Sequence, residues 1–249
     1  MKDHDKLAAI LEQLKWLRLP GMMRALDELI TRAKKANMTP LDIVGALADA
    51  EKASRIESAV KRRVRGARFA EISTVDNFDF DFDPIRRKSK ARYLALVDLG
   101  FLERGVCPIF VGPPGTGKTF LARSLAYSAC QATKSVLCTS AARMLNELQG
   151  AELHGNVERV LRKYTSPALL VVDDFAVLEM DTEQAKLAFQ VISERYDYRR
   201  STCITTNRPF KDWTKVFPDA LNAQVIAERL NERAERFLLD GKGYRNPEN

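Results

Sequence analysis

The sequence predicts an α/β fold, in which a parallel sheet is flanked by helices and preceded by a small all-helical domain. Two observations lead to this prediction. From residue 107 onward, short apolar runs alternate with stretches of helical period, a pattern typical of parallel strands joined by helices. Residues 1–70 carry helical periods and no strand pattern. With 249 residues and 45% hydrophobic content, the chain is long enough for one sizeable core and a second, smaller domain.

Three helices are expected in the N-terminal domain, residues 1–70. Apolar residues recur at helical spacing from Leu7 to Leu17, until Pro20-Gly21 interrupts the pattern. A second helix follows, and Thr39-Pro40 predicts the start of a third, because a capping hydroxyl precedes a proline at the first helical position. The end of this helix is strongly basic and is either a contact for DNA phosphates or a solvated helix end. Its basic residues are Lys61, Arg62, Arg63, Arg65 and Arg68.

An extended linker is expected over residues 71–84. Phenylalanine and aspartate alternate from Phe78 to Asp83, and Pro84 disfavours a helix at the residue before it. The three phenylalanines are expected to face one way and pack against the sheet domain, while the aspartates are solvated. A second basic cluster follows on a helix that is expected to end at Gly100, and it too is compatible with a solvated face. It consists of Arg86, Arg87, Lys88, Lys90 and Arg92.

A phosphate-binding loop is predicted between the first strand and its helix. The apolar run Cys107–Val111 is followed by the sequence GPPGTGKT, which fits the pattern G-x-x-x-x-G-K-[ST], and then by a helical period. The backbone N–H groups of such a loop surround a phosphate at a helix N-terminus, Lys118 bridges the β- and γ-phosphates, and Thr119 ligates Mg²⁺. The predicted ligands are therefore ATP and Mg²⁺, with the phenylalanines of the linker near the adenine. The nucleotide-binding residues are Gly112, Pro113, Pro114, Gly115, Thr116, Gly117, Lys118, Thr119 and Phe120.

Polar side chains are expected where two later strands end. The second strand is predicted over residues 135–139, and the third over 168–172, followed directly by Asp173 and Asp174. Open α/β sheets bind their ligands at the carboxyl ends of the strands. Asp173 is expected to help hold Mg²⁺, and Asp174 to orient and polarise the attacking water. The fourth strand, 201–206, ends in Asn207, whose carboxamide is expected to reach the γ-phosphate or the water.

These motifs in this order resemble the core of the AAA+ ATPases, with Walker A, Walker B and sensor 1. The resemblance assigns residues 85–249 to an AAA+ domain. Two helical segments, 141–149 and 157–164, stand where a basic core needs one, which resembles the initiator-type insertion of the DnaA and DnaC clade. In that clade the insertion lies along nucleic acid, so the resemblance implies phosphate contacts, with an ordinary amphipathic pair as the alternative. The candidate residues are Arg143, Arg159, Arg162 and Lys163.

The rest of the chain resembles the IstB-type proteins. After Asn207 the sequence has room for one long helix and a tail, but not for a separate helical lid, and DnaC-like and IstB-like proteins are similar in this respect. The segments that look most like IstB are Leu19–Met22, Arg208-Pro209, Trp213, Phe217–Asp219, Glu228–Leu230 and Gly241–Arg245. The resemblance implies a cytoplasmic ATPase that self-assembles on duplex DNA and assists the transposase of an insertion sequence.

In such an assembly, an arginine from a neighbouring subunit completes the ATP site. The resemblance assigns this role to Arg229, with Arg233 and Arg236 on nearby turns as alternatives and a second sensor at Arg245. A surface ion pair to Glu228, Glu232 or Glu235 is the alternative for Arg229, Arg233 and Arg236.

Two other functions stay open: a replicative helicase loader of the DnaC type, which prefers single-stranded DNA, and a DNA-binding scaffold in which the nucleotide is structural. The net charge of +7 permits nucleic-acid binding without requiring it. The four cysteines lack the spacing of a metal site and are expected to be reduced core residues. No signal peptide or membrane span is predicted.

Overall fold

The structure, a computed structural model, describes residues 3–218, 220–241 and 243. It divides into two compact units, Met1–Arg62 and Arg63–Asn249. The first unit contains α1 (Asp3–Trp16), α2 (Pro20–Ala36) and most of α3 (Pro40–Ala67), while the last residues of α3 belong to the second unit. Among the described residues, no helix is both long and apolar enough to cross a membrane.

The helices of the first unit approach closely at Gly21. A Cβ atom added there would lie 2.5 Å from the carbonyl oxygen of Ala50, so glycine permits α2 to touch α3. The Gly21 N–H donates to Oε2 of the buried Glu51 (2.8 Å), and the other carboxylate oxygen pairs with Arg55 (2.8 Å). At the start of α3, the Asp42 N–H donates to the Thr39 hydroxyl (3.3 Å), which confirms the predicted cap.

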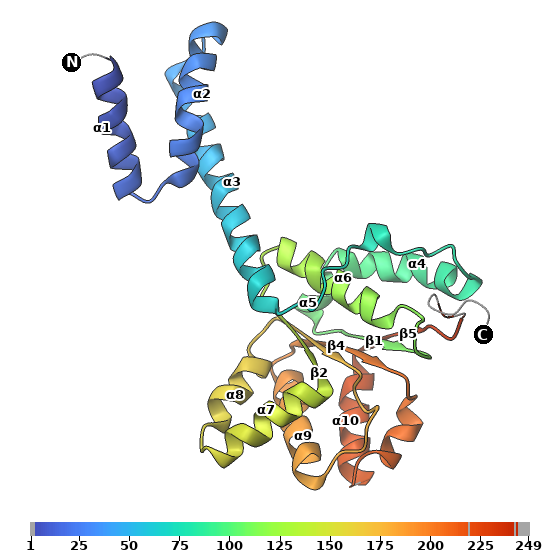
Figure 1. Ribbon diagram of the computed structural model, residues 1–249. Helices are drawn as coiled ribbons and strands as arrows, with labels where there is room; N and C mark the ends of the chain where they lie inside the picture. The colour runs from blue at the N-terminus through green and yellow to red at the C-terminus, as the bar shows by residue number, and fades with distance from the viewer. Residues whose placement is uncertain (1–2, 219, 242, 244–249) are drawn as a thin grey trace. The chain divides into compact units, whose positions relative to one another are not determined.

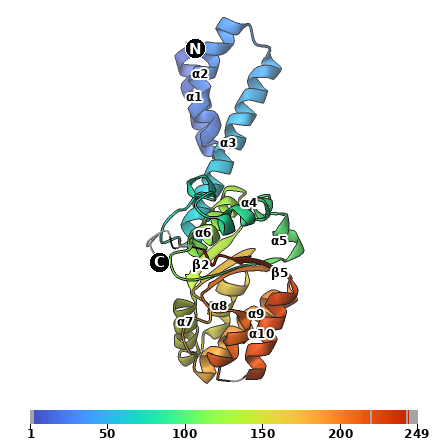
Figure 2. The same cartoon turned by 90° about the vertical axis from the view of Figure 1, so that its right-hand side faces the viewer.

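The second unit is built on a five-stranded parallel sheet of order β2-β3-β4-β1-β5, which confirms the predicted fold class (Figure 1). Its strands are β1 (Cys107–Val111), β2 (Val136–Ser140), β3 (Leu169–Asp173), β4 (Ser201–Thr206) and β5 (Ala234–Leu238). Helices α4 (Pro84–Val97), α5 (Gly100–Arg104) and α6 (Lys118–Gln131) cover one face. Helices α7 (Ala141–Leu153), α8 (Val157–Thr165), α9 (Thr182–Asp197) and α10 (Ala220–Glu232) cover the other (Figures 1 and 2).

The strands supply a core on each face because successive side chains point to opposite sides. In β1, Ile109 and Val111 join the cluster beneath α7–α10, whereas Phe110 joins the cluster beneath α4–α6. Leu169 and Leu170 of β3 divide in the same way. Burial on both faces explains why these strands are continuous apolar runs. The four cysteines are free, and all except the half-buried Cys138 are buried.

Three expectations about local structure were wrong. The segment after Asn207 forms a short 3₁₀ helix, η2 (Phe210–Lys215), then α10 and the strand β5, and not one long helix and a tail. Arg236 consequently lies on β5 and not on a helical turn. The helix that carries the second basic cluster, α4, ends at Val97 and not at Gly100, because Leu99 adopts a left-handed conformation (φ 63°), and Gly100 begins the separate short helix α5.

Candidate nucleotide-binding site

The loop between β1 and α6 has glycines where no other residue fits. At Gly112, an added Cβ would lie 2.1 Å from the carbonyl oxygen of Leu239, just after β5. Gly115 and Gly117 have positive φ angles of 83° and 94°. A Cβ on Gly117 would also lie 2.6 Å from the ring of Phe78. The loop is therefore held between the segment after β5 and the segment before α4, and its glycines keep the backbone open toward a ligand.

This loop borders a cavity of about 410 Å³. The tilted rings of Phe78 and Phe120 lie 5.6 Å apart in the lining, while Asp174 and Asn207 contribute polar groups from the ends of two strands. Gly112, Pro113 and Thr116 do not line the cavity, and the Thr116 hydroxyl donates to the Pro113 carbonyl (2.9 Å). The lining residues are Asn77, Phe78, Asp79, Arg86, Pro114, Gly115, Gly117, Lys118, Thr119, Phe120, Asp174 and Asn207. The size and the lining suit a nucleoside triphosphate.

Lys118 is held inside the loop that precedes it. Its ammonium donates to the carbonyl of Pro113 (2.7 Å), and the residue is only 7% exposed. Burial lowers the pKa of Lys118, although the nearby carboxylates of Asp174 and Asp173 partly oppose this effect. A buried cation beside a ring of backbone amides favours an anion, and the β- and γ-phosphates of a nucleotide supply one.

Asp173 gathers hydroxyl groups from two other elements. Its Oδ1 accepts hydrogen bonds from Thr119 on α6 (2.7 Å) and from Thr205 on β4. Its Oδ2 lies 3.7 Å from the guanidinium of Arg123. Among the described residues, no three His, Cys, Asp or Glu side chains could hold a metal ion by themselves. The Thr119 hydroxyl and the Asp173 carboxylate do fit Mg²⁺, which takes one or two protein oxygens together with phosphates and water.

Asp174 turns away from the strand that precedes it. Its φ angle is 55°, and its N–H donates to the Thr205 hydroxyl (3.0 Å). This turn gives Asp173 and Asp174 different surroundings, and Asp174 lines the cavity together with Asn207. Burial and the charge of Asp173 raise the pKa of Asp174, with Lys118 and Arg123 opposing. Sequence reasoning missed Thr205, which supports both aspartates.

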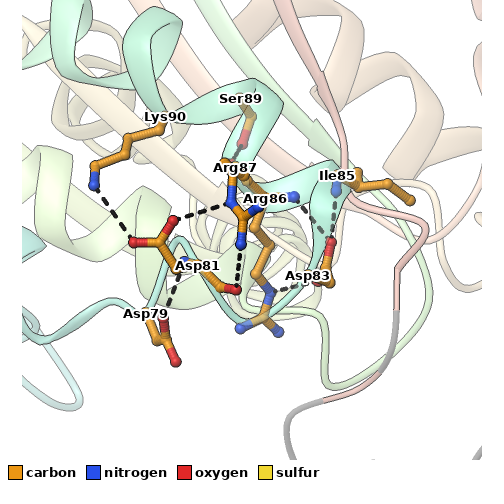
Figure 3. A network of polar contacts seen from close by, with 8 residues as sticks. All are labelled: Asp79, Asp81, Asp83, Ile85, Arg86, Arg87, Ser89 and Lys90. Carbon is orange, nitrogen blue, oxygen red and sulfur yellow. Dashed lines mark hydrogen bonds and ion pairs between the residues drawn. The ribbon is translucent and has the colours of Figure 1, made fainter.

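Arg86, at the start of α4, contributes a buried charge to the same cavity, and sequence reasoning missed both its burial and that of Asp83. Asp83 was expected to be solvated, but it is buried because its carboxylate caps α4, accepting from the N–H groups of Ile85 (2.8 Å) and Arg86 (2.9 Å) (Figure 3). Arg86 is 3% exposed, pairs with Asp83 (3.2 Å) and lies over the rings of Phe78 and Phe82. An aspartate directly before a helix-starting proline is a capping signal, so the sequence contained a signal from which the burial of Asp83 could have been predicted.

The other two aspartates of the phenylalanine–aspartate stretch, Asp79 and Asp81, are exposed, as expected. Asp81 pairs with Arg87 (3.1 Å) and Lys90 (3.8 Å) on the outer side of α4 (Figure 3). The three phenylalanines do not share one role: Phe78 lines the cavity, whereas Phe80 is buried in the core against Tyr93.

Replacing Arg86 with Ala is expected to destabilise the protein by about 3–5 kcal/mol, because the substitution leaves the buried Asp83 carboxylate without its ion pair. Urea unfolding measures this change. Arg87→Ala is the matched control: it removes an exposed pair to Asp81 and is expected to change stability by about 0.5 kcal/mol or less. Equal effects of the two substitutions would contradict a structural role for the buried pair.

Arg229 lies on α10 and does not line the nucleotide cavity. Its guanidinium lies over the rings of Phe189 (5.4 Å) and Tyr196 (5.3 Å). Arg233 lies over the same Tyr196 ring (4.2 Å) and donates to the Tyr196 carbonyl (3.0 Å). Arg236, on β5, lies over the ring of Phe210 in η2.

None of these arginines forms an ion pair with Glu228, Glu232 or Glu235 within the described part of the chain. Those glutamates instead accept hydrogen bonds from Gln224, Tyr196 and Arg92, respectively. Arg245 lies outside the described residues.

The candidate DNA contacts fall into two groups. Some already have partners: Arg63 donates to the Thr133 carbonyl (2.9 Å), and ion pairs join Lys61 to Glu57, Arg162 to Glu158 and Lys163 to Glu147. The others are exposed and make no side-chain hydrogen bond or ion pair with the residues that the structure describes. These are Arg62, Arg65, Arg143 and Arg159.

Comparisons with known proteins identify the family of this chain. Residues 12–249 match the family described as IstB-like ATP binding protein. The chain belongs to this family. Two IstB-like relatives are named as ATP-binding proteins of insertion sequences. One, from Mycobacterium tuberculosis, is 31% identical over 95% of this chain and 94% of its own length. The other, from Bacillus thuringiensis subsp. berliner, is 32% identical over 93% of this chain and 92% of its own length.

The fold comparison points to the same class. The crystal structure of the DnaC helicase loader superposes with a TM-score of 0.57 at 20% identity, covering 64% of this chain and 92% of that chain. At that identity the likeness concerns the fold alone, and it confirms the AAA+ architecture. This IstB-like chain is thus an ATP-binding protein with an AAA+ fold.

Proposed function

We propose that this protein is a Mg²⁺-dependent ATPase that assembles on duplex DNA and assists the transposase of an insertion sequence. The observation that carries the proposal is the meeting of Asp174 and Asn207 with Lys118 in one cavity. A protein that only binds nucleotide needs the phosphate loop. The additional carboxylate and carboxamide are the groups that hydrolysis requires, because a water must be oriented toward the γ-phosphate.

Each side chain has a distinct role in the proposed reaction. Lys118 leaves the Pro113 carbonyl and neutralises the β- and γ-phosphates, while Thr119 and Asp173 would hold Mg²⁺, which would supply further charge neutralisation. Asp174 orients the attacking water, and Asn207 donates to the γ-phosphate or to that water. Because Arg229 does not line the nucleotide cavity of its own subunit, we assign it to the site of a neighbouring subunit in a homo-oligomer.

The proposed DNA contact is electrostatic. The net charge is +7, and Arg143 and Arg159 are exposed on the two insertion helices α7 and α8. Such contacts reach phosphates and not base edges, so binding is expected to depend strongly on salt and weakly on sequence. The transposase is inferred as a partner because relatives are named as insertion-sequence proteins. We place this activity in the cytoplasm, where ATP and bacterial DNA are both present.

Steady-state ATP turnover of the purified protein, measured with duplex and with single-stranded DNA at matched low salt, tests the proposal. Turnover is expected to rise mainly with duplex, because the assembly forms on duplex and completes the shared ATP sites. Stimulation by single strands alone would instead favour a helicase loader. Absence of turnover with either DNA and with added transposase would leave a nucleotide-stabilised scaffold.

A further inference from the structure

A second cavity, of about 150 Å³, adjoins the nucleotide site and shares Thr119 with it. This is the volume of about five water molecules, which suits a phosphate group and is too small for a nucleoside. Asp173 lines this cavity together with arginines from three segments: Arg68 after α3, Arg123 on α6 and Arg143 on α7. The cavity lies within the second unit of the chain.

The walls of this cavity are strongly positive. Three guanidinium groups face one carboxylate, and that carboxylate already accepts hydrogen bonds from Thr119 and Thr205. Arg68 and Arg143 are exposed and form no side-chain hydrogen bond or ion pair with any residue that the structure describes. The Arg123 side chain is 26% exposed and therefore lies deeper. The cavity thus combines an inner guanidinium with two outer ones that are open to solvent.

The N-terminus of α7 borders the same cavity. Thr139 and Ser140 line it, and Ser140 is the N-cap of the thirteen-residue helix α7, accepting from the Arg143 N–H (3.2 Å). The positive end of a helix dipole favours an anion. Guanidinium groups bind phosphate oxygens in pairs of parallel hydrogen bonds, which makes arginine the side chain best matched to a tetrahedral oxyanion.

We propose that this cavity binds a phosphodiester group of the DNA backbone and couples DNA binding to the metal site. The proposal rests on the DNA binding proposed above. Arg123 lies 3.7 Å from Oδ2 of Asp173, the carboxylate that is proposed to hold Mg²⁺. A phosphate in the cavity competes with Asp173 for Arg123. Withdrawal of the guanidinium leaves the carboxylate free for the cation, so DNA strengthens Mg²⁺ binding at the ATP site.

The test compares Arg68→Gln and Arg143→Gln with Arg104→Gln. Arg104 is an exposed arginine on α5 that does not line the cavity, so its substitution makes the same change in charge. Fluorescence anisotropy measures the affinity for a labelled duplex over a range of salt concentrations. For each cavity variant, the slope of log affinity against log salt is expected to fall in magnitude by about 0.9, the loss of one phosphate contact. The control is expected to keep the wild-type slope, and wild-type slopes in both cavity variants would overturn the proposal.

Calorimetric titration with inorganic phosphate, at constant ionic strength and without DNA, separates the two sources of a phosphate group. Binding to the wild type that is lost in Arg143→Gln, together with unchanged DNA slopes, would assign the cavity to free phosphate and overturn the backbone assignment. If the wild type itself fails to bind duplex, the proposed function fails. The phosphate titration would then still report on the cavity as an anion site. Circular dichroism verifies that each variant is folded.

Discussion

Replacing Asp174 with Asn is expected to lower ATP turnover by about 10²–10⁴-fold while leaving ATP binding intact. The carboxamide has nearly the same shape as the carboxylate, but it lacks the negative charge that orients and polarises the attacking water. The phosphate loop and the Thr119–Asp173 pair are unaltered by the substitution. The fold is not expected to weaken, because burial and the charge of Asp173 both oppose the ionised form of Asp174.

Turnover and nucleotide affinity are measured separately in this experiment, the first by phosphate release and the second by equilibrium binding of a fluorescent ATP analogue. Asp197→Asn, at an exposed position at the end of α9, is the matched control and is expected to retain full turnover. An Asp174→Asn protein that turns over ATP at the wild-type rate would remove Asp174 from the mechanism. Unchanged release from DNA in this variant would favour the scaffold function.

Replacing Arg229 with Ala is expected to lower turnover in the DNA-bound assembly by about 10³–10⁵-fold, the range that a trans-acting arginine contributes to phosphoryl transfer. ATP binding by the isolated subunit is expected to persist, since Arg229 does not line its own cavity. The rings of Phe189 and Tyr196 hold the guanidinium in place, so the residue is positioned without a carboxylate partner among the residues that the structure describes.

Mixing variants gives this prediction its sharpest test. A subunit carrying Asp174→Asn still presents Arg229, and a subunit carrying Arg229→Ala still has an intact cavity. Where the intact cavity of an Arg229→Ala subunit meets Arg229 of an Asp174→Asn subunit, the shared ATP site is complete. The mixture is therefore expected to recover turnover that neither variant has alone. Failure to recover would contradict action in trans. If Arg236→Ala alone loses turnover and regains it when mixed with Asp174→Asn, while Arg229→Ala does not, the role belongs to the arginine on β5.

The site at the strand ends was predictable because parallel strands bring their carboxyl ends to one edge. Asp173 and Asp174 follow an apolar run and Asn207 follows the predicted strand 201–206, so their positions in the sequence fix their positions in the sheet. Thr205 was not predictable in this way. Threonine is common in strands, and nothing in the sequence shows that this hydroxyl faces Asp173.

The strand β5 was missed for a different reason. Its sequence, Ala-Glu-Arg-Phe-Leu, lies at the edge of the sheet and is half exposed, so it lacks the apolar run that identified the inner strands. Its charged residues have tertiary partners instead: Glu235 pairs with Arg92, and Arg236 lies over Phe210. Only the packing of distant segments makes this stretch a strand, and short edge strands are the elements for which local patterns carry least information.

The position of β5 has a consequence for how the protein is made. The strand β1, which leads into the phosphate loop, pairs with β4 on one side and β5 on the other, and both strands come much later in the chain. During synthesis, β1 therefore emerges from the ribosome long before either of its neighbours. Pairing over such separations is slow, and an unpaired apolar strand is open to other contacts in the meantime. Ribosome-bound chains that end before β5 are thus expected to leave this strand exposed to chaperones, and ATP cannot assist folding until nearly the whole domain has been synthesised.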